Sequence, residues 1–364
     1  MKIAIMGTRG IPAHYGGFET FAEQLSERLA KRGHKVTVYG RVGRVGDAEL
    51  PAGVRSVLLP AVRQKHLETV SNTVLSGFHA AFNSYDAVII CNVANSIVLP
   101  FYKLIKTPSL VCVDGLEEKR EKWGLVARMW LRASKKLAGT MSSAIIADAE
   151  VIQKHWESKA KVPVEMVTYG VADNSENSTG QLQKLGLKRD QYFLYASRLE
   201  PENNAELVIH AFEKVETDKK LVIVGDAPYA KRYISGLKST RDKRIIFTGA
   251  VYGSGYKQLH NNCFAYIQAT EVGGTHPALL EGLAWSPCVI AHKTKENEEV
   301  AADAALYFNM READDLAHQM RTILDAPEIR KNYMLKARKR IDLKYQWDRV
   351  VDQYEQIISD IVKA

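Results

Sequence analysis

The chain has 364 residues, of which 46% are hydrophobic and 25% are charged, as in an ordinary soluble globular protein. This length exceeds the size at which one core usually keeps growing, so two domains are expected. No run approaches the ~18 uninterrupted apolar residues of a membrane-spanning helix, and the N-terminus enters a strand pattern without the h-region of a signal peptide. The net charge of +8 favours an anionic partner, either nucleic acid, phospholipid or a phosphorylated substrate.

Metal and disulfide signatures are missing from the sequence. The cysteines lie apart from one another within apolar runs, at positions 91, 112, 263 and 288. We expect them to be reduced core residues of a cytoplasmic protein. The chain has no Asp-x-Asp, HExxH, P-loop lysine motif or nucleophile elbow, so neither a metal ion nor a bound cofactor is expected.

Apolar strand patterns alternate with helical segments along the first half of the chain. The strands expected there are Ile3–Met6, Lys35–Tyr39, Ala87–Cys91, Leu110–Val113, Ala144–Ala147 and Val164–Thr168. The first helix is amphipathic, since one face collects Phe18, Phe21, Ala22, Leu25 and Leu29. Gly33 is expected to end this helix.

The same pattern restarts after the polar segment 173–180, which we interpret as a linker. The strands expected in the second half are Tyr192–Ala196, Leu221–Val224, Ile245–Phe247, Phe264–Gln268 and Cys288–Ala291. From about Ala313 onward the chain is expected to be helical, with breaks at Pro327 and near Lys344.

Two successive βαβα units predict an α/β protein with two doubly wound, Rossmann-like domains. We assign residues 1–172 to the first domain and residues 186–340 to the second. Ligands of such sheets bind at the carboxyl ends of the strands. The expected site is therefore a cleft between two facing domains.

Paired glycines follow the first strand. Gly16 and Gly17 immediately precede the first helix, whose free N–H groups can hold an anion. Glycine also lets a substrate approach the backbone closely. A loop that merely needs positive φ explains them equally well, and spacing alone leaves both interpretations open.

Two charged side chains lie near predicted strand ends in the second half. Arg198 follows a strand directly, and its planar guanidinium suits a diphosphate, although a surface ion pair with Glu200 or Glu202 is the alternative. Glu281 is within reach of a ribose hydroxyl. The alternative interpretation of Glu281 is a solvated surface carboxylate. Its sequence neighbours are largely leucines, however, and a charge without a partner is costly in such surroundings.

Glycines precede the helix that carries Glu281. Gly273 and Gly274 leave space for a phosphate, and the backbone N–H groups of Thr275 and His276 would point toward it. A helix-capping role is the alternative for His276.

A basic segment, Lys119 to Lys136, holds seven basic residues, one acidic residue and two tryptophans. As one helix it would lie on an anionic membrane. The expected contacts are Arg128, Trp130, Arg132, Lys135 and Lys136. A solvated helix is the alternative. Asp114, just before the segment, stands at a predicted strand end.

Taken together, these motifs resemble the GT-B glycosyltransferases of family 4 over nearly the whole chain. The motifs are similar to those of one subgroup, the bacterial rhamnosyltransferases of cell-wall and capsular polysaccharide assembly. They are Gly7-Thr-Arg-Gly-Ile-Pro with Tyr15-Gly-Gly-Phe-Glu19, Asp114-Gly-Leu-Glu with Lys119-Arg120, Ser197-Arg-Leu-Glu-Pro-Glu-Asn-Asn204, and Gly273-Gly-Thr-His-Pro.

The resemblance implies a role for each motif. The implied donor-binding residues are Arg198, Asn203, Gly273, Gly274, Thr275, His276 and Glu281. The implied catalytic residues are Asp114, Arg198 and Glu271. The implied acceptor-side residues are Gly16, Gly17, Glu19, Lys119 and Arg120. The last helix, 346–364, is implied to pack back on the N-terminal domain.

The sequence departs from the family pattern at three positions. A family lysine is replaced by Asn203, which removes one positive charge from the diphosphate site. The family's first glutamate falls on Gly273, and Glu271 is the candidate substitute. Glu118 stands where the subgroup commonly has an aromatic residue.

The implied activity is retaining transfer of a sugar, with L-rhamnose from dTDP-L-rhamnose the best candidate, to a polyprenyl-diphosphate-linked saccharide. The leaving diphosphate oxygen would take the acceptor's proton in a front-face reaction, without a metal. We expect a cytoplasmic protein, peripheral on the inner face of the plasma membrane.

Three alternatives remain at this point. A GT-B sugar-nucleotide epimerase would release epimerised donor without acceptor. A non-catalytic polysaccharide-assembly scaffold would transfer nothing. A nucleic-acid-binding protein is prompted by the pI of about 9.1, but no nucleic-acid-binding motif supports it.

Overall fold

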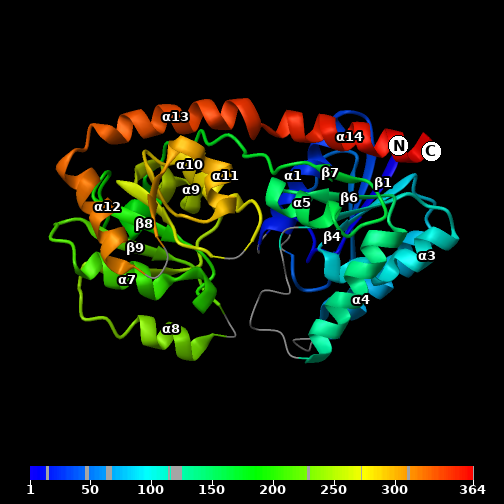
Figure 1. Ribbon diagram of the computed structural model, residues 1–364, viewed down its shortest axis with the longest axis horizontal. Helices are drawn as coiled ribbons and strands as arrows, with labels where there is room; N and C mark the ends of the chain where they lie inside the picture. The colour runs from blue at the N-terminus through cyan, green and yellow to red at the C-terminus, as the bar shows by residue number, and fades with distance from the viewer. Residues whose placement is uncertain are drawn as a thin grey trace. The chain divides into compact units, whose positions relative to one another are not determined.

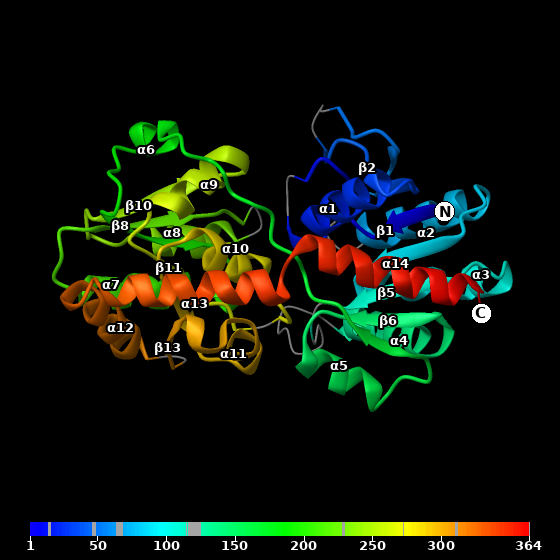
Figure 2. The same ribbon diagram turned by 90° about the horizontal axis from the view of Figure 1, so that it is seen from above.

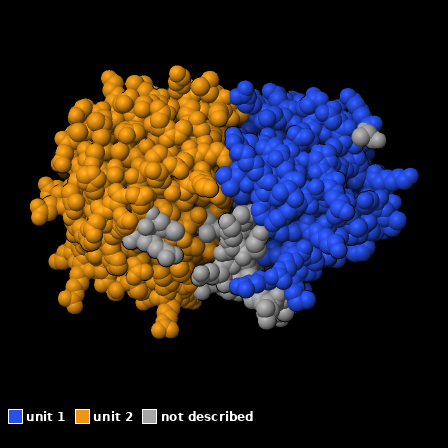
Figure 3. All heavy atoms as spheres, viewed as in Figure 1, with its two compact units in different colours: residues 1–170, 347–364 blue, residues 171–346 orange. Residues whose placement is uncertain are grey.

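A computed structural model describes residues 1–13, 16–45, 49–62, 68–113, 115, 125–227, 230–271, 273–309 and 312–363, with only the backbone described at 125 and 126. The chain divides into two compact units (Figure 3). One unit comprises residues 1–170 and 347–364, and the other comprises residues 171–346.

The first unit is built on a seven-stranded parallel sheet in the order β3-β2-β1-β4-β5-β6-β7 (Figure 1). Its strands are β1 (Lys2–Met6), β2 (Lys35–Arg41), β3 (Val54–Leu59), β4 (Ala87–Cys91), β5 (Ser109–Val113), β6 (Ala144–Ala147) and β7 (Val164–Met166). The central strands β4 and β5 are buried throughout, because helices cover both faces of the sheet.

Helices α1 (Gly17–Lys31) and α14 (Trp347–Lys363) pack together on one face of this sheet (Figure 2). Phe21 of α1 contacts Trp347 and Tyr354 of α14, with ring centroids 6.3 and 5.4 Å apart. The opposite face forms a second core under α2 (Glu68–Ala81), η1 (Val93–Val98), α3 (Leu99–Leu104), α4 (Leu125–Met141) and α5 (Glu150–Glu157).

The second unit contains a six-stranded parallel sheet in the order β10-β9-β8-β11-β12-β13. Its strands are β8 (Tyr192–Ala196), β9 (Lys220–Val224), β10 (Ile245–Gly249), β11 (Ala265–Gln268), β12 (Val289–His292) and β13 (Leu306–Phe308). The strand order reverses beside β8, between β8 and β11, which is where ligands of doubly wound sheets bind.

Helices again cover both faces of the second sheet. The core on one face is completed by α7 (Ala205–Glu213), α8 (Lys231–Leu237) and α12 (Ala313–Asp325). The remaining helices of this unit include α6 (Gly180–Lys184), α9 (Gly253–Asn262), α10 (Pro277–Trp285), α11 (Lys295–Ala301) and α13 (Ile329–Lys344). Breaks in helix occur at the positions predicted near Pro327 and Lys344.

The polar segment 173–180 is part of the second unit, so its interpretation as a linker is wrong. The Asn174 side-chain amide donates to Asn261 Oδ1 on α9 at 2.8 Å. The Trp285 indole donates to the carbonyl of Ala172 at 2.9 Å. The polar residues of this segment fasten it to neighbouring helices, and the division between units falls before it, at residue 170.

Candidate active site

The loop after β8 is held in place by internal hydrogen bonds. The side-chain amide of Asn203 donates to the carbonyl of Arg198 at 2.7 Å, and the Tyr195 hydroxyl donates to the carbonyl of Asn203 at 2.7 Å. Arg198 itself stays 42% exposed, with its guanidinium 3.7 Å from the Glu200 carboxylate. An exposed pair at that distance holds the arginine weakly, so Arg198 is free to meet an anion at the strand end.

Asn203 was expected to contact the donor, and the structure corrects this. Its side chain is 4% exposed and its amide is committed to the loop backbone. A buried donor with a backbone partner gains nothing from turning outward. Asn203 therefore supports Arg198 instead of replacing the family lysine.

The segments that follow β8 and β11 are tied together across the reversal of strand order. Asn204, at φ 59°, donates its side-chain amide to the Ala269 carbonyl at 2.8 Å and to Glu271 Oε1 at 3.2 Å. The Glu271 N–H donates to the Glu202 carbonyl at 3.3 Å. Glu271 thus lies at the same edge of the sheet as the loop that carries Arg198.

The start of α10 depends on a close contact between two predicted residues. A Cβ atom on Gly273 would overlap the His276 imidazole, so a larger residue at position 273 would oblige that ring to move. His276 caps α10 in an extended conformation, and Pro277 occupies the first turn. Thr275 is buried. The positive end of the helix dipole is therefore located next to Gly274.

Glu281 has a hydrogen-bond partner that the sequence did not reveal. The Tyr256 hydroxyl on α9 donates to Glu281 Oε2 at 3.0 Å. Burial raises the pKa of Glu281 to about 7, although the Tyr256 hydrogen bond and the charge of Lys257 oppose that rise. Glu281 is only partly exposed, so the alternative of a freely solvated surface carboxylate is excluded.

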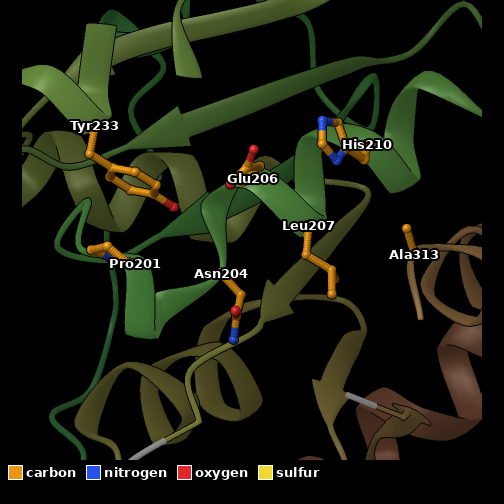
Figure 4. Close-up of a pocket in the computed structure, with 7 residues that line it drawn as sticks. All are labelled: Pro201, Asn204, Glu206, Leu207, His210, Tyr233 and Ala313. Atoms are coloured by element: carbon orange, nitrogen blue, oxygen red, sulfur yellow. The ribbon is translucent and has the colours of Figure 1, made fainter. Parts of the chain in front are cut away.

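A pocket of about 260 Å³ opens beside the loop that follows β8 (Figure 4). Its lining residues are Pro201, Asn204, Glu206, Leu207, His210, Tyr233 and Ala313. Neither Arg198 nor Glu281 lines it.

In the first unit, two glutamates of α1 hold the loop that follows β1. Glu19 Oε1 accepts from the Arg9 N–H at 2.8 Å, and Glu23 Oε1 accepts from the Ala13 N–H at 3.2 Å. Glu19 is 8% exposed, and burial raises its pKa. Its expected acceptor-side contact is corrected, because the carboxylate faces the loop backbone.

The paired glycines stand at the turn into α1. Gly16 adopts φ 101° and Gly17 is the first helical residue. The positive φ that a loop would require is thus present at Gly16. Gly16 is exposed, and a Cβ atom built on it would lie 3.0 Å from Glu19 Oε2.

The sequence did not single out Arg41, a buried arginine at the end of β2. Arg41 is 6% exposed and lies 3.4 Å from Glu68, which also accepts from Arg44 at 2.9 Å. Burial acts to raise the pKa of Glu68, but the hydrogen bond from Arg44 and the Arg41 charge lower it below its ordinary value. The signal in the sequence that could have predicted this ion pair is an arginine that directly follows the apolar pattern of a strand.

The basic helix α4 presents only part of the predicted membrane contact. Arg128, Arg132 and Lys136 are exposed. Trp130 was expected at the headgroup level, but its indole donates to the Ala94 carbonyl at 3.0 Å and holds α4 against η1. The Lys135 ammonium lies 5.8 Å from the Trp156 ring. Trp130 and Lys135 are only partly exposed, so their expected contact with a membrane stays a prediction.

Residues 178–340, within the second unit, match the model of a protein family described as glycosyl transferases group 1. These residues are therefore similar to group 1 glycosyltransferases. A second model, described as a domain of unknown function (DUF1972), matches residues 1–42. The matched group 1 region contains Arg198, Glu271 and the whole of α10.

Two curated relatives resemble about half of the chain. One, from Campylobacter jejuni subsp. jejuni serotype O:2, is "N-acetylgalactosamine-N,N'-diacetylbacillosaminyl-diphospho-undecaprenol 4-alpha-N-acetylgalactosaminyltransferase", 25% identical over 48% of this chain and 48% of its own length. The other is the lipopolysaccharide 1,2-N-acetylglucosaminetransferase of Salmonella typhimurium, 27% identical over 48% of this chain and 50% of its own length. The chain thus spans about half the length of the relatives it matches.

The whole chain is similar in structure to the sucrose-phosphate synthase (tll1590) of Thermosynechococcus elongatus. The TM-score is 0.82 at 19% identity, and the match covers 99% of this chain and 98% of the other. The expected α/β fold class, GT-B with two Rossmann-like domains, is confirmed.

Several predicted residues fall outside the region that matches the group 1 glycosyltransferase model. Gly16, Gly17 and Glu19 belong to the first unit. Asp114, Lys119 and Arg120 lie outside the described residues. Among the residues that the structure describes, no group of three or more His, Cys, Asp and Glu side chains is arranged to hold a metal ion. In that same part of the chain, no helix has the length and apolarity to cross a bilayer.

Proposed function

We propose that the chain is a retaining glycosyltransferase of bacterial surface polysaccharide synthesis. It transfers a sugar, with L-rhamnose from dTDP-L-rhamnose the best candidate, to a polyprenyl-diphosphate-linked saccharide. The observation that carries the proposal is the joined pair of loops after β8 and β11, which brings Arg198 and Glu271 to one sheet edge. The names of the two relatives, one with a diphospho-undecaprenol acceptor, support the class of acceptor.

Donor binding follows from charges at the carboxyl end of the second sheet. Arg198 offers a planar, permanently charged fork to the diphosphate. The N–H groups at Gly274, Thr275 and His276 add partial positive charge at the start of α10. Glu281, ionised above pH 7, accepts hydrogen bonds from the ribose hydroxyls.

The reaction is a front-face substitution at the anomeric carbon. The acceptor hydroxyl attacks as the bond to the diphosphate breaks, and its proton passes to the departing diphosphate oxygen. Arg198 and the helix-terminus amides stabilise the charge that develops there, which takes the place of a metal ion. Glu271 contacts the sugar ring. The role of Asp114 toward the incoming hydroxyl rests on its motif alone, since this residue lies outside the described residues.

The acceptor lies at a membrane, so the protein binds there peripherally, at the inner face of the plasma membrane. The exposed residues Arg128, Arg132 and Lys136 of α4 face anionic headgroups. Each such cation contributes about 1 kcal/mol near an anionic surface. The attachment is therefore reversible and sensitive to salt.

A thermal-shift panel tests donor binding directly, because a ligand that binds only the folded state raises the melting temperature. The panel contains UDP, GDP, dTDP and their sugar conjugates. We expect dTDP and dTDP-L-rhamnose to give the largest shifts in the native protein and much smaller shifts in Arg198→Ala. Equal shifts in both proteins would remove Arg198 from the donor site, and no shift with any nucleotide would refute the proposed function.

A further inference from the structure

An apolar groove of about 340 Å³ runs between α2 and the η1–α3 segment of the first unit. The residues that line it are Val74, Gly77, Phe78, Ile97, Val98, Pro100, Phe101 and Leu104. Phe78 and Phe101 meet across it with ring centroids 4.9 Å apart. Nearly all of its lining is hydrocarbon, yet the groove opens at the protein surface.

Large apolar side chains are exposed on the elements that line the groove or pack against them. Phe82 at the end of α2 is 83% exposed, Leu104 at the end of α3 is 78% exposed, and Met129 on α4 is 68% exposed. These elements are neighbours, because η1 packs against both α2 and α4, and α3 packs against α4. Monomeric soluble proteins rarely leave contiguous apolar surface of this kind without a partner.

Positive charge surrounds this apolar surface. The exposed basic residues are Lys103 and Lys106 on and just after α3, with Arg128, Arg132 and Lys136 on α4. Among the described residues of α2, η1, α3 and α4, the sole carboxylate is Glu68. Glu68 is buried and paired with Arg44 and Arg41, so it leaves the positive field intact.

We infer that the α2–α3–α4 surface docks on an anionic bilayer, with Phe82, Leu104 and Met129 entering the acyl region and the cations resting on phosphates. An apolar centre with a basic rim matches the two layers of a leaflet, hydrocarbon inside and anionic headgroups outside. The inference rests on the proposed membrane attachment and adds an inserted apolar contact to the α4 cations.

A second copy of the chain is a poorer occupant. Two identical surfaces would bring five basic side chains against five others, without carboxylates to neutralise them. A leaflet of anionic lipid supplies the missing negative charge, and its fluid acyl chains fit a groove without a defined polar pattern.

The test is vesicle co-sedimentation of the full chain carrying Phe82→Ser and Leu104→Ser together. The control carries Leu335→Ser and Leu343→Ser on another basic helix, α13, where both leucines are more than half exposed, at 55% and 58%. Vesicles contain phosphatidylcholine with or without phosphatidylglycerol. The first variant should bind anionic vesicles at least about ten-fold more weakly than the native chain, since each inserted side chain loses its transfer free energy. The control should bind like the native chain.

Vesicle binding in high salt distinguishes insertion of apolar side chains from attraction between the basic residues and the lipid headgroups. The native chain should keep part of its vesicle binding in high salt, whereas the Phe82/Leu104 variant should lose all of it. Unchanged binding in that variant would overturn the inference. So would binding that requires added polyprenyl phosphate, which would make the groove a prenyl-chain site, or a change of oligomeric state in the variant, which would make it a dimer interface.

Sugar transfer to a short-chain, water-soluble acceptor distinguishes this inference from the proposed function. That activity should be equal in the native chain, the variant and the control, because neither Phe82 nor Leu104 belongs to the active site. Vesicle binding with no transfer in the native chain would sink the proposed function and leave the docking surface standing. Sugar transfer by the native chain, together with equal vesicle binding in all three proteins, would support the proposed function and refute the docking surface.

Discussion

The side-chain amide of Asn203 donates a 2.7 Å hydrogen bond to the backbone carbonyl of Arg198. This contact closes the loop after β8 on itself and fixes the point from which the arginine side chain leaves the backbone. Tyr195 holds the other end of the loop through the Asn203 carbonyl. Asn203 therefore holds the backbone from which the Arg198 side chain leaves.

Asn203→Ala should weaken donor binding by loosening this loop. Loss of a buried hydrogen bond costs about 1–3 kcal/mol, which corresponds to a fall of several degrees in melting temperature for a unit of this size. Steady-state kinetics should show a raised KM for the donor with a smaller change in kcat. The control is Asn177→Ala, at an exposed asparagine of the same unit. Equal KM and melting temperature in both variants would make the Asn203 contact irrelevant.

Arg198→Ala should lower the transfer rate by about 10²–10³, the usual cost of one lost donor to a developing negative charge. Its melting temperature should stay within about a degree of the native value, because the side chain is 42% exposed. Arg241→Ala, at an exposed arginine elsewhere in the unit, serves as the control and should turn over normally. Near-native turnover in Arg198→Ala would return that residue to the role of a surface partner of Glu200.

Glu281→Gln should remove a pH dependence. Because burial raises the folded-state pKa of Glu281 to about 7, from an ordinary value of 4.5, the stability that protonated Glu281 contributes is complete below pH 4.5 and is lost as the pH rises through 7. The native chain should therefore fall in melting temperature relative to Glu281→Gln between pH 5 and pH 8. Over the same range the native chain should gain nucleotide affinity, as the carboxylate forms, and the variant should not. Parallel pH profiles would contradict this account.

A strong chelator should leave transfer intact. The proposed diphosphate site uses Arg198 and the start of α10 in place of a divalent ion. Initial rates measured in EDTA should equal those in buffer alone, and added Mg²⁺ or Mn²⁺ should change them little. Complete loss of rate in EDTA, restored by one divalent ion, would require a different arrangement of charges.

Much of the fold could be predicted from apolar patterns. The predicted bounds of β4, β6 and β8 match the observed strands, because central parallel strands are continuous hydrophobic runs. The strands β3 and β13 were missed. Both lie at sheet edges, where half-exposed residues interrupt the apolar run.

The candidate site was less accessible to sequence reasoning, because side-chain direction and distant partners are set by tertiary packing. Asn203 and Trp130 have residue types that suit a ligand or a membrane, yet both hydrogen-bond to backbone carbonyls of their own unit. The partner of Glu281 is Tyr256, which lies on a different helix. The one signal in the sequence was that Glu281 is flanked by apolar residues, where a charged side chain needs a partner.

The central claim is transfer of a sugar from a nucleotide diphosphate to a lipid-linked acceptor. Its most direct test incubates the native chain with dTDP-L-rhamnose and a polyprenyl-diphosphate-linked saccharide in EDTA, and follows the acceptor by mass spectrometry. We predict an acceptor heavier by one sugar residue, released dTDP, and an α-configured product if the donor sugar is α-linked. An unchanged acceptor with every nucleotide sugar tried, or an epimerised nucleotide sugar formed without acceptor, would contradict the account.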